Sequence, residues 1–100
     1  MNYFVYILIS KSTHRFYIGQ TTDLDERLAY HNGNRVKSTK NRGPWVFLFT
    51  TQVNSLKNAI ALERKLKNLK SRKRILVWIS KNIKHRSSVG PEFYQIFDLD

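Results

Sequence analysis

The segment YFVYILI at residues 3–9 decides the fold, because it is an unbroken run of aromatic, β-branched and other apolar residues. A strand with one exposed face alternates apolar and polar residues, whereas a strand covered on both faces is apolar throughout. We therefore expect a central strand here. Turn residues follow at 10–14, and the segment RFYIG at 15–19 regains strand character. The first twenty residues therefore predict a hairpin, in which Gly19 lets the backbone turn closely.

A helix is predicted over about 23–32. Thr22 supplies an N-cap hydroxyl, the carboxylate of Asp25 follows three residues later, and Asn32-Gly33 is a typical stop signal. These signals place the helix directly after the hairpin, so that one of its sides turns toward the sheet.

The inward side of this helix is unusual, because Arg27 and His31 share it with Leu24 and Leu28 at 100° per residue. Arg27 alone is explained by an apolar stem with a solvated head group, and His31 alone by a cation at the helix carboxyl end. Two polar side chains one turn apart on the apolar side favour the lining of a pocket.

The middle of the chain predicts a loop, a strand and two more helices. Residues 34–43 are polar and basic, which fits a phosphate-gripping loop or a mobile surface loop. Residues 44–53 are apolar and β-branched, so they predict a third strand, after which Asn54 or Ser55 caps a helix. Residues 71–82 favour a third helix, although a short strand also fits.

Composition limits the classes of function. The chain of 100 residues has 41% hydrophobic and 13% aromatic residues, which is typical of a folded domain. Its formal net charge of +11 indicates that its partner is a polyanion, and nucleic acid is the first candidate. The lack of cysteine excludes disulfides, thiolate zinc sites and a cysteine nucleophile. We expect a soluble cytoplasmic protein without a membrane segment, one domain over 1–83, and a tail of undefined order over 84–100.

Glu63 is the single carboxylate between Arg27 and Pro91, a stretch with sixteen Lys and Arg residues. Magnesium is held by one or two protein carboxylates, with water and substrate phosphates completing the shell, so a lone acid can hold a cation that bridges protein to phosphate. An ordinary ion pair with Lys67, one turn further along the helix, is the alternative. Glu63 falls within the predicted apolar stripe of Leu56, Ala59, Ile60, Leu62, Leu66 and Leu69.

These residues together resemble the GIY-YIG nuclease superfamily, in particular its small single-domain bacterial members, over about residues 3–80. The matching segments are Phe4-Val5-Tyr6, Tyr17-Ile18-Gly19, Asp23 to Leu28 with His31-Asn32, and Glu63. Phe4 replaces the first glycine of the signature, and Gln20 stands where some relatives have lysine. The resemblance implies an α+β fold with a small three-stranded antiparallel sheet flanked by about three helices.

The resemblance also implies the site. Tyr6 and Tyr17 match the signature tyrosines, Arg27 the catalytic arginine, His31 the accompanying histidine and Glu63 the ligand of one Mg²⁺ or Mn²⁺ ion. Arg27 would neutralise nonbridging phosphate oxygens, and Tyr6, Tyr17 or His31 would position the attacking water or accept its proton. Further substrate contacts are expected at Gly19, Arg35, Lys37, Thr39, Lys40, Arg42 and Lys67.

The sequence thus predicts a metal-dependent DNA endonuclease that acts on branched, nicked or damaged DNA in repair or recombination, alone or with a protein partner that supplies specificity. A domain of 100 residues has little surface for reading a long sequence. A noncatalytic nucleic-acid-binding module of the same fold is the alternative, and a ribosome-associated structural protein is a third candidate that leaves an inward-facing Glu63 unexplained. The oligomeric state stays open.

Overall fold

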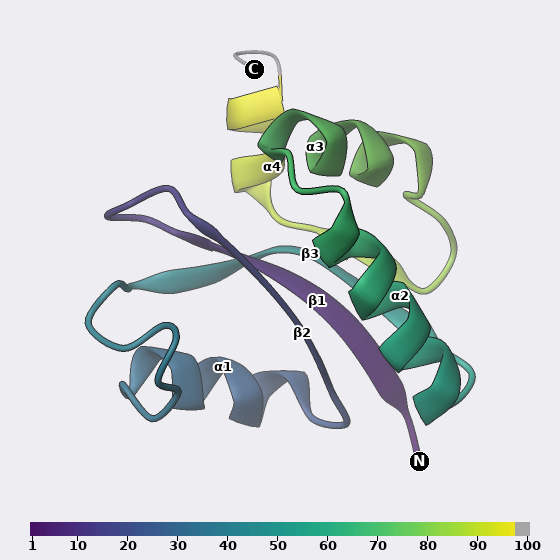
Figure 1. The fold of residues 1–100 in the computed structure, drawn as a ribbon, viewed down its shortest axis with the longest axis horizontal. Coiled ribbons are helices and arrows are strands. Elements are labelled where there is room, and N and C mark those ends of the chain that lie inside the picture. The colour runs from purple at the N-terminus through teal and green to yellow at the C-terminus, as the bar shows by residue number, and fades with distance from the viewer. Residues whose placement is uncertain (98–100) are drawn as a thin grey trace.

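The computed structural model describes residues 1–97, which form a four-stranded antiparallel sheet with helices on both of its faces (Figure 1). The strand order is β2-β1-β3-β4. The elements in chain order are β1 (Tyr3–Ser10), β2 (Phe16–Thr21), α1 (Leu24–Asn32), β3 (Trp45–Val53), α2 (Leu56–Asn68), α3 (Arg72–Lys81), β4 (Ser87–Val89) and α4 (Pro91–Phe97).

Strand β1 lies between β2 and β3, which confirms the predicted central strand and hairpin. Its alternate side chains supply two separate cores. Val5, Ile7 and Ile9 pack with apolar side chains of α2 and α3, whereas Tyr6 and Leu8 pack with those of α1 on the other face. Strand β2 forms one edge of the sheet, so both faces of the sheet can be reached from this edge.

Helix α1 follows the prediction except at its first residue. Asp23, rather than Thr22, is the N-cap: its backbone is extended and its carboxylate accepts a hydrogen bond from the backbone N–H of Glu26 at 3.0 Å. The hydroxyl of Thr21 supports this turn by accepting from the N–H of Asp23. Gly33 closes the helix, as expected, and donates its N–H to the carbonyl of Ala29.

Helices α2 and α3 cover the opposite face. Ser55 caps α2, which confirms one of the two predicted caps, and residues 72–81 are helical, which excludes the strand alternative. The predicted stripe of α2 is narrower than expected, because Leu56 and Ile60 are 46% and 43% exposed. The buried residues of α2 are Ala59 and Leu66, and Leu62 and Leu69 pack against the same core while they are partly exposed.

The tail adds a strand and a helix that the sequence did not predict. Strand β4 pairs with β3, with Val89 opposite Phe49, and Phe93 of α4 is buried in the same core as α2 and α3. The α+β class is therefore as expected, and residues 1–97 form four strands and four helices in place of the expected three strands and about three helices. Residues 98–100 of the predicted tail lie outside the described residues. None of the helices in the described part is both long and apolar enough to cross a membrane.

Candidate active site

A buried hydrogen-bonded chain connects the central strand, helix α1 and the loop that follows it. The hydroxyl oxygen of Tyr6 lies 2.8 Å from Nε2 of His31, and Nδ1 of His31 lies 2.8 Å from Oγ1 of Thr39. All three side chains are almost inaccessible, at 1%, 1% and 0% exposure. Because a buried polar group without a partner is costly, the three groups depend on one another for their hydrogen bonds.

Donor and acceptor counting fixes the direction of this chain. The Tyr6 hydroxyl accepts from Arg27, so its own hydrogen is available to Nε2 of His31, and the Thr39 hydroxyl, which lies 3.3 Å from the carbonyl of Val36, can donate there and accept from His31. The proton of neutral His31 therefore sits on Nδ1, and Nε2 carries the lone pair. It follows that the Tyr6 hydroxyl donates its hydrogen to Nε2 of His31.

Arg27 and Tyr17 form the accessible rim of this buried chain. The Nε–H of Arg27 donates to the Tyr6 hydroxyl at 3.4 Å, and the Tyr17 ring lies 4.7 Å from the His31 ring between centroids. Arg27 and Tyr17 are both half-buried, in contrast to Tyr6 and His31. Its contact with Tyr6 raises the pKa of the Arg27 guanidinium above its usual value, so Arg27 remains charged at every relevant pH.

Burial keeps Tyr6 and His31 neutral. It raises the pKa of Tyr6 to about 12, against the opposing effect of the hydrogen bond from Arg27, and the negative charge of Glu63 adds a smaller upward contribution. Burial and the neighbouring charge of Arg27 together lower the pKa of His31 to about 4. The cation at this site near neutral pH is therefore Arg27 alone among these three groups.

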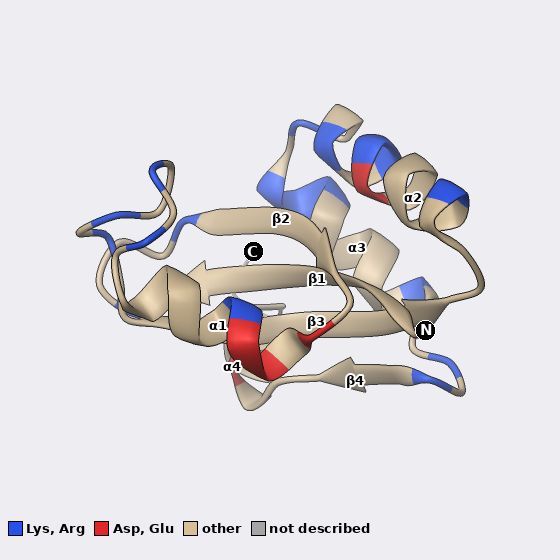
Figure 2. Ribbon diagram, turned by 90° about the horizontal axis from the view of Figure 1, so that it is seen from below, with Lys and Arg blue, Asp and Glu red and all other residues tan. Residues whose placement is uncertain are grey.

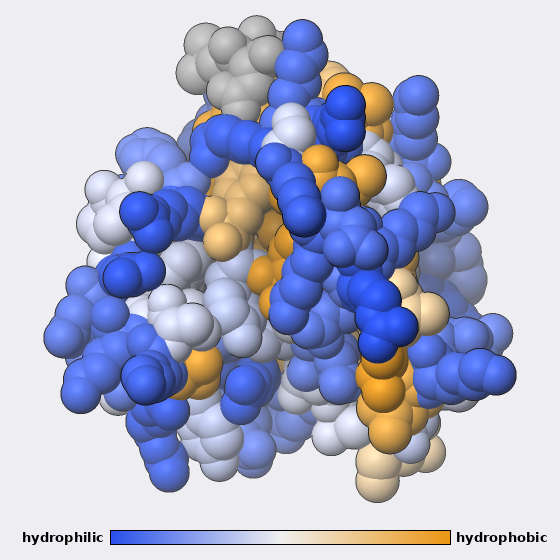
Figure 3. All heavy atoms as spheres, viewed as in Figure 1, coloured by the Kyte–Doolittle hydropathy of each residue, from blue (hydrophilic) through white to orange (hydrophobic). Residues whose placement is uncertain are grey.

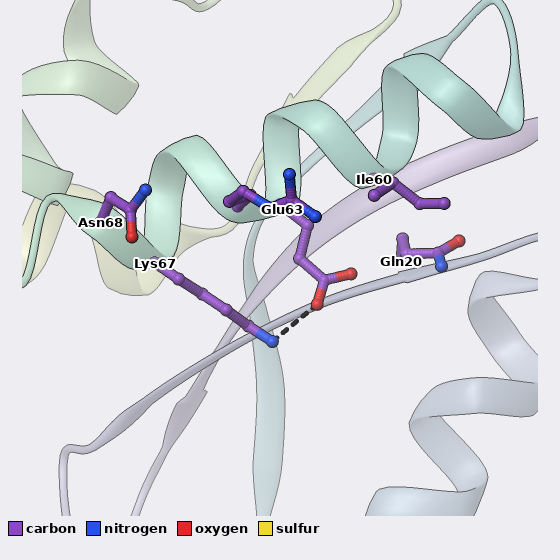
Figure 4. Close-up of a pocket in the computed structure, with 6 residues that line it drawn as sticks. Gln20, Ile60, Glu63, Lys67 and Asn68 are labelled. Carbon is purple, nitrogen blue, oxygen red and sulfur yellow. Dashed lines mark ion pairs between the residues drawn. The ribbon is translucent and has the colours of Figure 1, made fainter.

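Glu63 lies on the other face of the sheet, across the edge strand β2. It lines a hollow of about 380 Å³ with Gln20, Ile60, Arg64, Lys67 and Asn68. Figure 4 shows its carboxylate directed away from α2 toward the strand that carries Gln20, with Lys67 beside it at 2.6 Å. The ion pair considered as the alternative role of Glu63 is thus present. Figure 2 shows β2 between α1, the helix that carries Arg27, and α2, the helix that carries Glu63.

The hollow at Glu63 fits a hydrated divalent ion. The Glu63 side chain retains 22% exposure, and the Gln20 side chain lines the same hollow with an amide oxygen, the ligand type that Mg²⁺ and Mn²⁺ prefer. Within residues 1–97, no group of three or more His, Cys, Asp or Glu side chains lies close enough to hold a metal. An ion at Glu63 would therefore take most of its ligands from water and phosphate.

The predicted substrate-binding residues divide into two groups. Arg35, Lys37, Lys40 and Arg42 are exposed on the loop that follows α1, and Lys67 stands beside Glu63 on α2. Thr39 and Gly19 do not fit a direct substrate contact, because both are buried. Thr39 bonds to His31, and Gly19 packs against the ring of Tyr6.

The sequence did not predict the supporting roles of two residues, Trp45 and Asn32. The indole N–H of buried Trp45 donates to the carbonyl of Thr39 at 3.2 Å, and the Asn32 side chain bonds to the backbone N–H and carbonyl of Trp45. Together they hold the loop that carries Thr39 against α1. The only sequence signal was the need of a buried tryptophan for an acceptor, which does not name the acceptor.

Comparisons with known proteins show which family this chain is similar to. A family model described as the GIY-YIG catalytic domain matches residues 2–75. The UPF0213 protein BH0048 of Halalkalibacterium halodurans is 39% identical over 75 residues, which cover 74% of this chain and 79% of that protein. The UPF0213 protein YsiG of Lactococcus lactis is 38% identical over 82 residues, which cover 81% and 78% of the two chains.

Two further comparisons concern the fold and a larger relative. The solution NMR structure of the UPF0213 protein BH0048 from Bacillus halodurans has a TM-score of 0.56 and 32% identity, covering 95% of this chain and 94% of that one. A Caenorhabditis elegans protein named structure-specific endonuclease subunit SLX1 homolog is 46% identical over 52 residues, which cover 43% of this chain and 12% of that protein.

Proposed function

Because the chain belongs to the family of the GIY-YIG catalytic domain, we propose that it is a metal-dependent endonuclease that hydrolyses phosphodiester bonds of DNA. The observation that carries the proposal is the pair of charges at the end of β2. Helix α1, which carries Arg27, and helix α2, which carries Glu63, lie on the two sides of this edge strand (Figure 2). The charge of Glu63 contributes to the raised pKa of Tyr6, which Arg27 contacts. A DNA backbone crossing the edge of β2 would meet both charges.

Glu63, with Gln20, would hold Mg²⁺ or Mn²⁺ at this edge. The bound ion supplies positive charge to a phosphate oxygen and makes water a stronger acid. Arg27 neutralises nonbridging oxygens of the same phosphate. One of its five N–H donors is committed to Tyr6, so the guanidinium is held in place while it keeps donors for the substrate.

Burial and hydrogen bonding support one of the three candidates for the group that handles the attacking water. The Nε2 lone pair of His31 already accepts the Tyr6 hydroxyl, and both side chains are 1% exposed. Tyr17 is half-buried and stands at the rim beside Arg27. We assign the positioning of the water and the acceptance of its proton to Tyr17. Tyr6 and His31 then act as buried supports that orient Arg27 and Tyr17.

Branched, nicked or damaged DNA is the substrate class we propose, in repair or recombination. A 100-residue domain has little surface for reading a long sequence, whereas a charged edge can recognise the shape of a backbone. The similarity to a structure-specific endonuclease subunit over 52 residues supports the same class.

DNA binding without catalysis is the competing function. The ion pair between Lys67 and Glu63 favours it, because Lys67 neutralises the carboxylate that would hold the metal ion. The two are separated by incubating wild type, Glu63→Gln and Arg27→Lys with labelled branched, nicked and intact duplex DNA in Mg²⁺ or Mn²⁺. If the protein is an endonuclease, the cleavage rate should fall at least a hundredfold in both variants, while Glu63→Gln should still bind DNA. Lys57→Gln, on the exposed side of α2, is the control and should cleave normally.

Two results would overturn the proposal. Cleavage that survives both substitutions would come from a contaminating nuclease. Salt-sensitive DNA binding by a wild-type protein that cleaves none of the three substrates would establish the binding module instead.

A further inference from the structure

A second positive hollow continues from the Glu63 hollow along the edge of the sheet. It has a volume of about 380 Å³ and lies between the start of β2 and the junction of α2 with α3. Lys67 lines both hollows, so they adjoin at this side chain. Among residues 1–97 no carboxylate lines the second hollow, whose lining residues are His14, Arg15, Phe16, Lys67, Lys70, Ser71, Arg72 and Ile75.

The positive charges beside this hollow destabilise the amino end of helix α3, which borders it. A helix is stabilised by acidic residues in its first turn, because its amino end carries partial positive charge. Helix α1 follows this rule with Asp25 and Glu26, whereas α3 begins with Arg72, Lys73 and Arg74 and has no acid in its first turn. Figure 2 shows red at the start of α1 and blue at the start of α3. An anion bound nearby would remove this conflict.

The junction between α2 and α3 combines one strained backbone position with side-chain contacts that hold it against the hairpin. Lys70 has a positive φ of 51°, a conformation that lysine adopts rarely. Arg72 stacks on the Phe16 ring, with its guanidinium carbon 4.6 Å from the ring centroid, and donates to the carbonyl of His14. These contacts join the amino end of α3 to the hairpin, so the cations from two distant segments face one hollow.

The spacing fits a nucleic-acid backbone that extends from the cleavage site. From Glu63 to the end of α2 at Asn68 the helix rises about 7.5 Å, comparable to the axial rise of about two nucleotides in one DNA strand. Beyond that point lie Lys70 and Arg15, both exposed. Figure 3 shows hydrophilic side chains over most of the face that carries α2 and α3.

We propose that this hollow, defined by Arg15, Lys67, Lys70 and Arg72, binds the phosphodiester backbone of the DNA segment that flanks the scissile phosphate. The proposal rests on the proposed nuclease function for its choice of DNA. It assigns to the hollow a positioning role: contacts to backbone phosphates carry no sequence information and fix the register of the duplex on the protein. The flanking segment would therefore need to extend at least two or three nucleotides on one side of the cleaved bond.

The test measures binding without cleavage. A fluorescein-labelled 24-base-pair duplex is titrated in EDTA with wild type, with Arg15→Gln/Lys70→Gln, and with the control Lys57→Gln/Lys81→Gln, which removes the same charge from exposed positions outside the hollow. Each phosphate contact contributes about 0.9 to the slope of log K against log salt. We expect the first double variant to lose about two units of slope and roughly tenfold in affinity at 0.1 M salt, with the control close to wild type.

Circular dichroism and urea unfolding establish that both variants are folded. Equal losses in the two double variants would overturn the proposal, because affinity would then follow net charge and not this hollow. Normal DNA binding by Arg15→Gln/Lys70→Gln, together with lost binding to vesicles containing phosphatidylserine, would reassign the hollow to a membrane surface. Because EDTA prevents cleavage, the result does not depend on whether the protein is an active nuclease.

Discussion

The backbone of Gly19 lies against the phenol ring of Tyr6, so closely that a Cβ atom on Gly19 would stand 2.5 Å from the Tyr6 hydroxyl oxygen. The two residues are directly paired in the register of β1 and β2. Gly19 has no positive φ, so its backbone is one that any residue adopts, and the glycine is required for space. The signature glycine therefore makes room for the signature tyrosine.

Gly19→Ala is expected to destabilise the protein by about 1–3 kcal/mol, because Tyr6 is packed on all sides and has no room to move. Urea unfolding measures this loss. In the double variant Gly19→Ala/Tyr6→Leu the added methyl group no longer meets the hydroxyl oxygen and the ring carbon Cζ, which lie 2.5 and 2.6 Å from its position, so the double variant should lose less stability than the sum of the two single losses. A Gly19→Ala protein as stable as wild type would contradict the close approach.

Thr39→Val is expected to disturb His31 without changing the shape of the core. The variant leaves the Nδ1–H of His31 without its acceptor, at a cost of about 1–3 kcal/mol, whereas Thr39→Ser keeps the hydroxyl and should retain most of the stability. Nitrogen NMR of the imidazole should show the Nδ1–H form in wild type and in Thr39→Ser. The opposite tautomer in wild type would contradict the assigned direction of the hydrogen-bonded chain.

The contrast between β1 and the loop at 34–43 shows which parts of the site could be predicted. The central strand and the inward side of α1 follow from the spacing of residues within one segment, so sequence alone identified Arg27 and His31 as inward-facing. Thr39 lies among Lys37, Lys40 and Arg42 in a polar segment. Its burial depends on contacts with His31 and Trp45, which follow from the path of an irregular loop and not from a helix or strand period. Local pattern carries no information about such contacts.

The tail shows the same limit. Strand β4 has three residues, too few for a recognisable alternation, and it forms because β3 presents an unpaired edge. Phe93 is buried because β3 and α3 leave an apolar surface that the short helix α4 covers. Both outcomes are decided by the rest of the fold, so the sequence of the tail alone left its order open.

The unfolding free energy should fall between pH 6.5 and pH 4 because of His31. The pKa of His31 is about 4 in the folded protein and about 6.5 in an unfolded chain, so acid favours the unfolded state, which binds the extra proton. This proton uptake lowers the unfolding free energy by an amount on the order of 3 kcal/mol at pH 4, and the loss disappears above pH 7. In His31→Gln this slope should be absent, whereas His85→Gln, at an exposed position, should keep it. Parallel stability curves for wild type and His31→Gln would exclude a neutral buried His31.

Lys67→Met should strengthen metal binding in the absence of DNA. The ammonium of Lys67 pairs with Glu63 at 2.6 Å, and an exposed pair of this kind is worth about 0.2–1 kcal/mol. The dissociation constant for Mn²⁺ should therefore fall by a factor of about 1.4 to 5. Electron paramagnetic resonance of free Mn²⁺ measures this change. Lys57→Met removes the same charge near the start of α2 and should leave the affinity unchanged. Equal affinities in all three proteins would place the ion elsewhere than at Glu63.

Tyr17→Phe and Tyr6→Phe should differ in which property they lose. The Tyr17 hydroxyl stands at the accessible rim, so its removal should lower the cleavage rate of bound DNA by about 10²–10⁴-fold, the usual contribution of a group that handles a proton, while leaving the stability nearly unchanged. Removal of the Tyr6 hydroxyl leaves Nε2 of buried His31 without its donor and should cost about 1–3 kcal/mol of stability. Single-turnover cleavage and urea unfolding separate these effects. A larger rate loss in a stably folded Tyr6→Phe than in Tyr17→Phe would transfer the proton-handling role to Tyr6, because a purely supporting hydroxyl cannot contribute more to the chemical step than the group that it supports.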